Sequence, residues 1–323
     1  MQDPCNNIES LDFYSDESFE KIILRDKHTR VEGMFTEYFF YEEILKDVFS
    51  DVSSSWWFRQ RSGAYNIAKI IYEEDDLSSF DVKILNYLSN QKINVFIIIF
   101  NKKEKKFYYI KYKEEYSNKL SEALCEFKKE YPKNPKNAAI PKKNERNEKR
   151  ILQAIGYLKS VGVLKNCAIE RLFANCWLAE GAFWDIDFFV EYKGKLIAFE
   201  VKQKYPTKAG TFGINVGLAN LFVYLNNIGM EVIHVILVKP VNDISIPAID
   251  LYTKPQFKKD AKWIATRFTR DMLRNRKSTA PSYTSIFGTS RLDYYHMKPE
   301  IFTTIKEINS KDNRILSFLD NCF

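Results

Sequence analysis

The chain has 323 residues, of which 45% are hydrophobic and 28% are charged. This balance excludes a disordered chain, and the length favours two domains over one. The formal net charge of +7 suits a nucleic-acid partner without requiring one. The five cysteines include no CxxC pair and there are three histidines, so we expect neither a zinc site nor a disulfide framework.

The N-terminal segment is polar and acidic, and no run in the chain approaches eighteen apolar residues. These features predict a cytoplasmic protein in a reducing compartment, without a membrane partner.

The first region, residues 1–127, is predicted to be an α/β domain that recognises a target or binds a partner. Its expected elements are helices at 31–49 and 77–90, a strand at 65–72, and a hairpin of strands at 93–100 and 105–112.

The segment Trp56-Trp57-Phe58-Arg59-Gln60-Arg61 has two interpretations. Its aromatic side chains either anchor the core of this domain or stack on nucleic-acid bases. We favour the core, because adjacent tryptophans are most often buried.

A change in composition between Lys128 and Arg150 marks the best domain boundary. This stretch reads KKEYPKNPKNAAIPKKNERNEKR, with three prolines and many lysines. It predicts a basic linker at 128–143, which we interpret as solvated in preference to a dedicated phosphate-binding tail.

A second domain is expected at 144–250, followed by a basic helical extension at 251–323. The expected elements are helices at 144–160, 214–228 and 256–276, and strands at 168–174, 185–192, 195–203 and 231–238.

The sequence WDIDFFVEYKGKLIAFEVKQK at 184–204 alternates with period two and predicts a β-hairpin. A two-residue turn at Lys193-Gly194 is the simplest connection, because glycine supplies the positive φ that such turns need. This turn would place Asp187 directly opposite Glu200, and Asp185 opposite Lys202.

Two carboxylates placed opposite each other repel, with Cβ atoms about 4.5–5.5 Å apart. A bound Mg²⁺ would turn this repulsion into coordination, because Mg²⁺ commonly takes one or two carboxylates together with water and phosphate. Lys202 shares a face with Glu200 and would reach a phosphate oxygen or a metal-bound water.

Asp187 followed by Glu200-Val201-Lys202, on a strand–turn–strand that precedes a helix and another strand, resembles the PD-(D/E)xK nuclease superfamily. Ile186 stands where the motif has its proline. The resemblance covers about 144–240 and implies an α/β fold: a restriction-endonuclease-like core with a central mixed β-sheet flanked by helices, here joined to the N-terminal α/β domain.

The resemblance also implies a mechanism. Asp187, Glu200 and Lys202 would be the catalytic residues, and Asp187, Glu200 and the carbonyl of Val201 would hold Mg²⁺, with Mn²⁺ as a substitute. The metal would activate water and stabilise charge on the scissile phosphate. Lys202 would orient or deprotonate that water or neutralise the transition state.

Two further acids are accessory candidates. Glu148 lies at the edge of the apolar stripe of the helix at 144–160, where it either faces the site or is a solvated first-turn residue. Asp185 either assists the metal or pairs with Lys202, and we favour the pairing.

Nucleic-acid contacts are expected from two basic segments. Lys204 and Lys208 lead into a loop that either contacts the backbone or is plain surface. The helix expected at 256–276 belongs to a stretch with nine basic and two acidic residues, which suits a duplex backbone. Its candidate residues are Lys258, Lys262, Arg267, Arg270 and Arg274.

These features predict a Mg²⁺-dependent DNA endonuclease that serves restriction, host defence or a mobile element. Duplex cleavage would favour a homodimer, and the N-terminal domain would serve a protein partner or the target. The alternatives are a structure-selective or transposition-associated nuclease, and a catalytically silent nucleic-acid-binding protein of the same fold.

Overall fold

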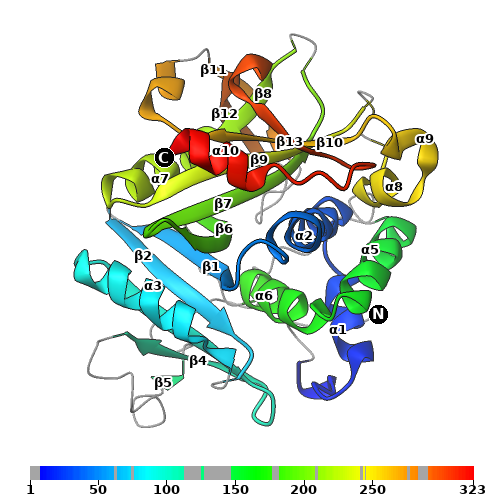
Figure 1. The fold of residues 1–323 in the computed structure, drawn as a ribbon. Coiled ribbons are helices and arrows are strands. Elements are labelled where there is room, and N and C mark those ends of the chain that lie inside the picture. Colours follow the sequence, from blue (N-terminus) through cyan, green and yellow to red (C-terminus); the bar gives the residue numbers. More distant parts are fainter. Residues whose placement is uncertain are drawn as a thin grey trace. The chain divides into compact units, whose positions relative to one another are not determined.

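In its computed structural model the chain is an α/β protein (Figure 1). It describes residues 8–61, 64–73, 76–112, 125–126, 147–176, 182–207, 210–240, 243, 245–274, 277–282 and 290–323. The linker expected at 128–143 and the candidate Lys208 lie outside these residues.

The described residues form two units. Unit 1 contains residues up to Val31 together with Ser53–Ile186, and unit 2 contains Glu32–Val52 together with the residues from Asp187 onward. Each unit is thus built from separate stretches of the chain.

Unit 1 has a mixed sheet in the order β1-β2-β3-β4-β5, in which only β2 and β3 are parallel. The expected hairpin is confirmed, because β3 pairs antiparallel with β4. The bounds of the strands are β1 Val52–Arg61, β2 Ala64–Ile71, β3 Asn94–Asn101, β4 Lys106–Lys111 and β5 Cys125–Glu126. The helices of this unit are α1 Asp16–Ile23, α3 Ser79–Asn90, α5 Glu148–Ser160 and α6 Leu164–Cys176.

The strand expected at 168–174 is wrong, because helix α6 covers this segment. Its buried residues Ala168, Ile169, Leu172 and Phe173 recur at helical spacing. The segment is apolar as expected, but its buried residues follow the period of a helix and not that of a strand.

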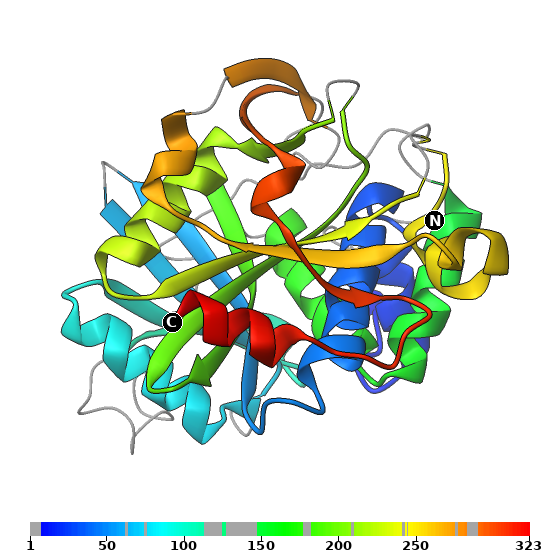
Figure 2. The ribbon, with the colours of Figure 1, turned by 45° about the horizontal axis from the view of Figure 1, so that its top comes forward.

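Unit 2 has a mixed sheet in the order β6-β7-β9-β10-β13, in which β7 and β9 are parallel and the other neighbours are antiparallel. The C-terminal helix α10, Ile315–Cys322, lies beside this sheet in both views (Figure 1, Figure 2). The bounds of the strands are β6 Ala182–Tyr192, β7 Lys195–Lys204, β9 Glu231–Val238, β10 Lys262–Arg267 and β13 Thr303–Glu307.

The long basic helix expected at 256–276 is wrong. The segment instead contains the short helix α9, Pro255–Lys258, strand β10, and the 3-10 helix η8, Arg270–Arg274. Strand β10 lies between β9 and β13 and is buried from Trp263 to Thr266. A strand buried on both faces has no alternating pattern, so the apolar residues of β10 also fit the stripe of a helix.

One face of the unit 2 sheet is covered by helix α2, His28–Phe40, and by the π-helical turn η2, Tyr41–Leu45, that continues it. The ring of Phe40 packs 5.6 Å from that of Phe199 and 5.3 Å from that of Trp263. Because Phe199 and Glu200 are consecutive in β7, their side chains point to opposite faces of the sheet. The aromatic packing on α2 therefore directs Glu200 to the other face.

That other face is covered by helix α7, Val216–Asn227, and by a small sheet in the order β11-β12-β8. Phe222 of α7 lies 6.1 Å from His234 of β9, and Phe302 lies 6.3 Å from the same ring. The strands of the small sheet are β8 Phe212–Asn215, β11 Lys277–Ser282 and β12 Ser290–Met297. Short helix α8, Ala248–Thr253, precedes α9.

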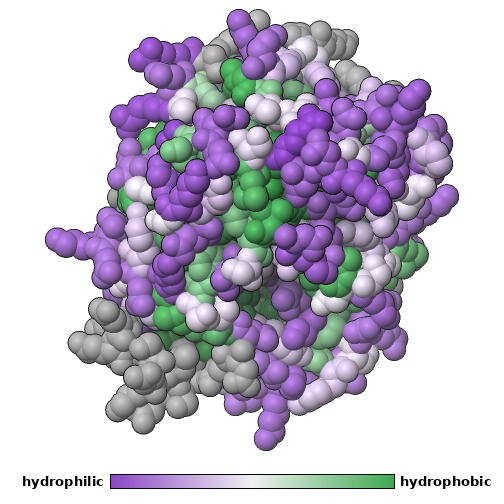
Figure 3. All heavy atoms as spheres, viewed as in Figure 1, coloured by the Kyte–Doolittle hydropathy of each residue, from purple (hydrophilic) through white to green (hydrophobic). Residues whose placement is uncertain are grey.

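The visible surface is mainly hydrophilic (Figure 3). The large hydrophobic side chains that are exposed among the described residues are scattered along the chain: Tyr14, Leu152, Tyr252, Ile301 and Leu316. Within the described part of the chain, none of the helices has the length and apolar character that crossing a membrane requires.

The turn that sets the β6–β7 register gives a stability prediction. Gly194 has a φ of 74°, and a Cβ added there would meet no atom within 4 Å. Gly194→Ala should therefore lower the free energy of unfolding by about 1 kcal/mol, through backbone strain alone. Urea unfolding measures this change.

Gly33→Ala is the matched control in the same unit. Gly33 lies inside α2, where alanine is the better helix former and its Cβ would make an ordinary contact with Glu37. We expect this variant to be at least as stable as the wild type. Equal stability of Gly194→Ala and the wild type would contradict the strained turn.

Candidate metal and phosphate site

The β6–β7 hairpin has the register that its turn predicts. The paired residues run from Phe188 and Phe199 to Tyr192 and Lys195. Lys193 and Gly194 both have positive φ, at 48° and 74°, as a two-residue hairpin turn requires. This register, continued by one residue, brings Asp187 next to Glu200.

Both carboxylates are buried, with Asp187 6% exposed and Glu200 1% exposed. The Val201 amide donates a hydrogen bond of 2.6 Å to Oδ2 of Asp187. This bond fixes the Asp187 side chain against the neighbouring strand, where it faces the residues around Glu200.

Lys202 joins the two acids. Its Nζ lies 2.5 Å from Oε1 of Glu200 and 3.8 Å from Oδ2 of Asp187, and its side chain is 33% exposed. The structure thus brings together the three residues that the sequence singled out. The exposed part of Lys202 gives the cluster access to solvent.

His234 supports the cluster from strand β9, and sequence reasoning did not select it. It is fully buried opposite Glu200 in the parallel register, and its Nδ1 lies 3.2 Å from the Glu200 carbonyl oxygen. A carbonyl oxygen can only accept a hydrogen bond, so Nδ1 of His234 is the donor and carries the proton. Burial, and then the positive charges of Lys204 and Lys202, lower the pKa of His234 well below its usual value. The signal in the sequence is a histidine inside the otherwise apolar run VIHVILV at 232–238.

Lys204 ends strand β7 on the same face as Glu200 and Lys202. Its ammonium donates a hydrogen bond to the carbonyl of Gly213 in β8. Burial, and then the charge of Lys202, lower the pKa of Lys204 to about 8. Lys204 therefore carries a positive charge at neutral pH in a place where that charge is poorly solvated.

The loop after Lys204 is tied to the small sheet by side chains. The hydroxyls of Thr207 and Thr211 lie 2.8 Å apart, and the Thr211 hydroxyl lies 3.0 Å from Nδ1 of His296. His296 in turn bonds the hydroxyl of Ser278 through Nε2. This series of hydrogen bonds holds β8, and with it the Gly213 carbonyl, beside the end of β7.

The donor set fits a hard divalent cation that keeps water or phosphate as further ligands. Among the described residues no group of three or more His, Cys, Asp or Glu side chains is arranged around a common point. Asp187 and Glu200 are thus the candidate side-chain ligands, which is the number that Mg²⁺ commonly uses in proteins. The Val201 amide already bonds Asp187, so the backbone at Val201 lies within this site.

The accessory acids lie in unit 1. Glu148 is exposed in the first turn of α5, and Asp185 is half-buried on β6. The half-buried Glu170 of α6 was not selected from the sequence. Burial is the main cause that raises its pKa, and the negative charge of Asp185 contributes.

The basic candidates of the C-terminal region separate into two groups. Arg267 is held by Glu231 through two contacts of 2.9 Å and also bonds the Cys322 carbonyl. The guanidinium of Arg267 is therefore committed within unit 2. The other candidates do not lie on one helix. Of these, Lys262, Arg270 and Arg274 are exposed and Lys258 is half-buried.

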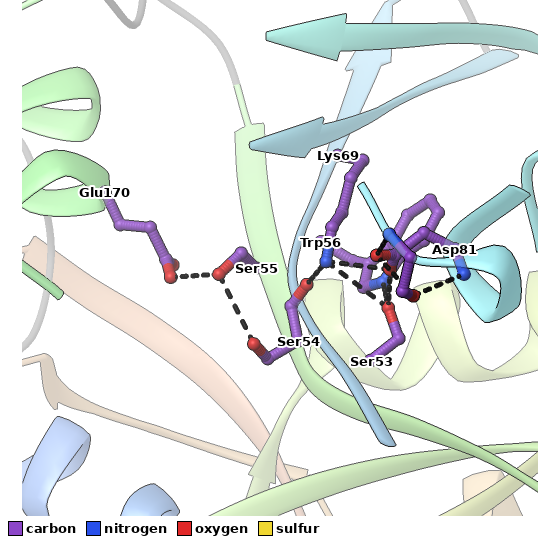
Figure 4. A network of polar contacts seen from close by, with 8 residues as sticks. Ser53, Ser54, Ser55, Trp56, Lys69, Asp81 and Glu170 are labelled. Atoms are coloured by element: carbon purple, nitrogen blue, oxygen red, sulfur yellow. Dashed lines mark hydrogen bonds and ion pairs between the residues drawn. The ribbon is translucent and has the colours of Figure 1, made fainter. Parts of the chain in front are cut away.

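The tryptophans of β1 are part of the core of unit 1, with Trp56 fully buried and Trp57 5% exposed. This confirms the packing interpretation over base stacking. Around Trp56, the buried Lys69 lies 2.9 Å from Oδ1 of Asp81 and bonds the Ser54 carbonyl at 2.6 Å (Figure 4). Trp56 Nε1 donates to the Ser53 hydroxyl at 2.6 Å.

Figure 4 also shows Ser55 pointing away from this buried cluster toward Glu170, to which its hydroxyl donates. Ser55 has a φ of 64°, which is rare for a residue with a side chain. Among the described residues of this network, each polar group has a partner that explains its burial.

In comparisons with known proteins, no family model, no curated protein and no solved structure matches this chain. The geometry of the β6–β7 hairpin is therefore the basis of the functional argument.

The lowered pKa of Lys204 predicts how stability depends on pH. Between pH 8 and 10.5 the unfolded lysine binds more protons than the folded one, so the free energy of unfolding of the wild type should rise with pH in this window. We expect a gain of about 1–3 kcal/mol relative to Lys204→Met, which lacks the group. Urea unfolding of both proteins at pH 7.5, 9 and 10.5 measures it. A constant difference between them across this range would show that the burial of Lys204 is not as described.

Proposed function

We propose that this protein is a metal-dependent phosphodiester hydrolase, and specifically an endonuclease that cuts DNA. The observation that carries the proposal is the buried pair Asp187 and Glu200, with Lys202 2.5 Å from Glu200, on one face of a β-hairpin. The resemblance of these residues to the PD-(D/E)xK motif supports the same conclusion, together with the expectation of a restriction-endonuclease-like core.

Asp187 and Glu200 would hold the cation, and the Val201 carbonyl is a further candidate ligand. When bound, Mg²⁺ lowers the pKa of a coordinated water and neutralises charge on the phosphate. Without a cation, the ammonium of Lys202 is the positive group that lies beside both carboxylates. A cation bound by Asp187 and Glu200 would compensate the carboxylates instead. The ammonium of Lys202 would then be available to contact a phosphate oxygen or the attacking water.

The protein contributes preorganisation to this chemistry. The Val201 amide fixes Asp187, and the neutral His234 bonds the backbone of Glu200. Groups that are already oriented need no rearrangement when charge develops on the phosphate.

A second candidate is a nucleic-acid-binding protein that keeps this site without catalysis. The short contact between Lys202 and Glu200 supports it, because an internal lysine already compensates the carboxylate. The two candidates differ in one property, which is whether a divalent cation makes the protein cut its nucleic acid.

The test of the catalytic proposal is cleavage of plasmid DNA with Mg²⁺. Lys202→Ala should lower the cleavage rate by at least 100-fold, about 3 kcal/mol of transition-state stabilisation, with DNA binding changed by less than about threefold. The matched control is Lys195→Ala, because Lys195 begins the same strand and is exposed. We expect Lys195→Ala to cut at the wild-type rate.

Cleavage by Lys202→Ala at the wild-type rate would refute the assignment of the catalytic residues. DNA binding by the wild type without cleavage in Mg²⁺ or Mn²⁺ would favour the silent binding protein. Discrete fragments would indicate a restriction enzyme, whereas preferential cutting of branched DNA would indicate a structure-selective nuclease.

Removal of the metal gives an independent prediction. EDTA should abolish cleavage and Mn²⁺ should restore it, because both ions accept carboxylate and water ligands. Gel analysis of plasmid nicking after EDTA treatment and after readdition of each ion measures this dependence. Unchanged nicking in excess EDTA would contradict a metal-dependent reaction.

A further inference from the structure

Lys204 differs from Lys202 in the way its charge is compensated. Lys202 contacts two carboxylates, whereas the acceptor for Lys204 is the carbonyl of Gly213. Over the residues that the structure describes, Lys204 forms no ion pair with an acid. An ammonium has three donors, and a single carbonyl supplies only part of what a half-buried charge requires.

The position of Lys204 follows from the strand. Lys202 and Lys204 are two residues apart on β7, so they share a face and their Cα atoms are about 6–7 Å apart. Two neighbouring phosphates on one nucleic-acid strand have a comparable separation. The two lysines are therefore spaced so that each can contact one of two consecutive phosphates.

The charges of the cluster support an anionic ligand at this position. The cluster combines two carboxyl groups, those of Asp187 and Glu200, with two lysine side chains on the same face of β7, so its formal charges balance. A divalent cation held by the acids would leave this face with a surplus of two positive charges. Two consecutive phosphodiesters carry the two negative charges that would balance it.

The small sheet fixes Lys204 in place for this contact. Gly213 lies opposite His296 in the β8–β12 ladder, and His296 is bonded to both Thr211 and Ser278. The acceptor of Lys204 thus belongs to a cross-linked part of the structure. A long side chain held in this way loses less conformational freedom when it binds a phosphate.

We propose that Lys204 binds the phosphodiester next to the one that faces Lys202, so that the site recognises two consecutive phosphates of a nucleic-acid backbone. This inference rests on the proposed function for the identity of the ligand. It adds a second anion subsite, formed by Lys204 at the end of β7.

The experiment measures the affinity for a duplex oligonucleotide in EDTA, by fluorescence anisotropy, as a function of salt concentration. Each phosphate contact contributes about 0.9 to the slope of log K against log salt for duplex DNA. Lys204→Met should reduce the magnitude of the slope by about 0.9. Lys204→Arg, which keeps the charge, should have the wild-type slope.

Lys311→Met is the control for the loss of one surface charge, because Lys311 is exposed in unit 2. It should leave the slope unchanged. A slope for Lys204→Met equal to that of the wild type would overturn the inference, as would a wild type that does not bind DNA. Circular dichroism of Lys204→Met verifies that the variant is folded.

The outcomes separate this inference from the proposed function. Metal-dependent cleavage together with an unchanged slope for Lys204→Met would refute the subsite and leave the nuclease intact. A reduced slope in a protein that never cuts DNA would support the subsite while refuting catalysis.

Discussion

The burial of two carboxyl groups on adjacent strands is the constraint on which the site depends. Asp187 and Glu200 are almost completely removed from water. Burying an ionised carboxylate costs several kcal/mol unless hydrogen bonds and a cation compensate for it. In this structure the Val201 amide and Lys202 provide part of that compensation. A site built in this way is suited to a divalent cation, because such an ion balances both acids at once.

The rest of unit 2 keeps this pair in place. The aromatic contacts of α2 bury one face of the sheet and thereby direct the charged residues of β7 to the other face. Strand β9 supplies His234 beside Glu200, and the small sheet supplies the acceptor for Lys204. The candidate site therefore lies on one hairpin, and its neighbours hydrogen-bond to the backbone of Glu200 and to the ammonium of Lys204.

Much of the hairpin could be predicted from the sequence because each of its features has a local cause. The alternation of residues 184–204 set the faces, and the Lys193-Gly194 turn set the register that the structure has. His234 could not be chosen in this way, because its role depends on the parallel pairing of β7 with β9, which are separated in the chain by α7.

The errors have a physical cause as well. Strand β10 is covered on both faces, so its apolar residues do not alternate, and in the sequence they continue a helical stripe. The buried positions of helix α6 include consecutive apolar pairs, and such pairs in a short segment also fit a buried strand. In both segments the structure depends on which faces the rest of the protein buries. The local sequence pattern does not contain that information.

The central claim is that Asp187 and Glu200 form a cation site with which Lys202 competes. Mn²⁺ binding, measured by electron paramagnetic resonance on the wild type, Glu200→Gln and Lys202→Met, tests it most directly. We expect the wild type to bind Mn²⁺ and Glu200→Gln to lose at least tenfold in affinity. Lys202→Met should bind at least as tightly as the wild type, because the competing ammonium is gone. Equal Mn²⁺ affinity in the wild type and Glu200→Gln, or no binding by any of the three, would contradict it.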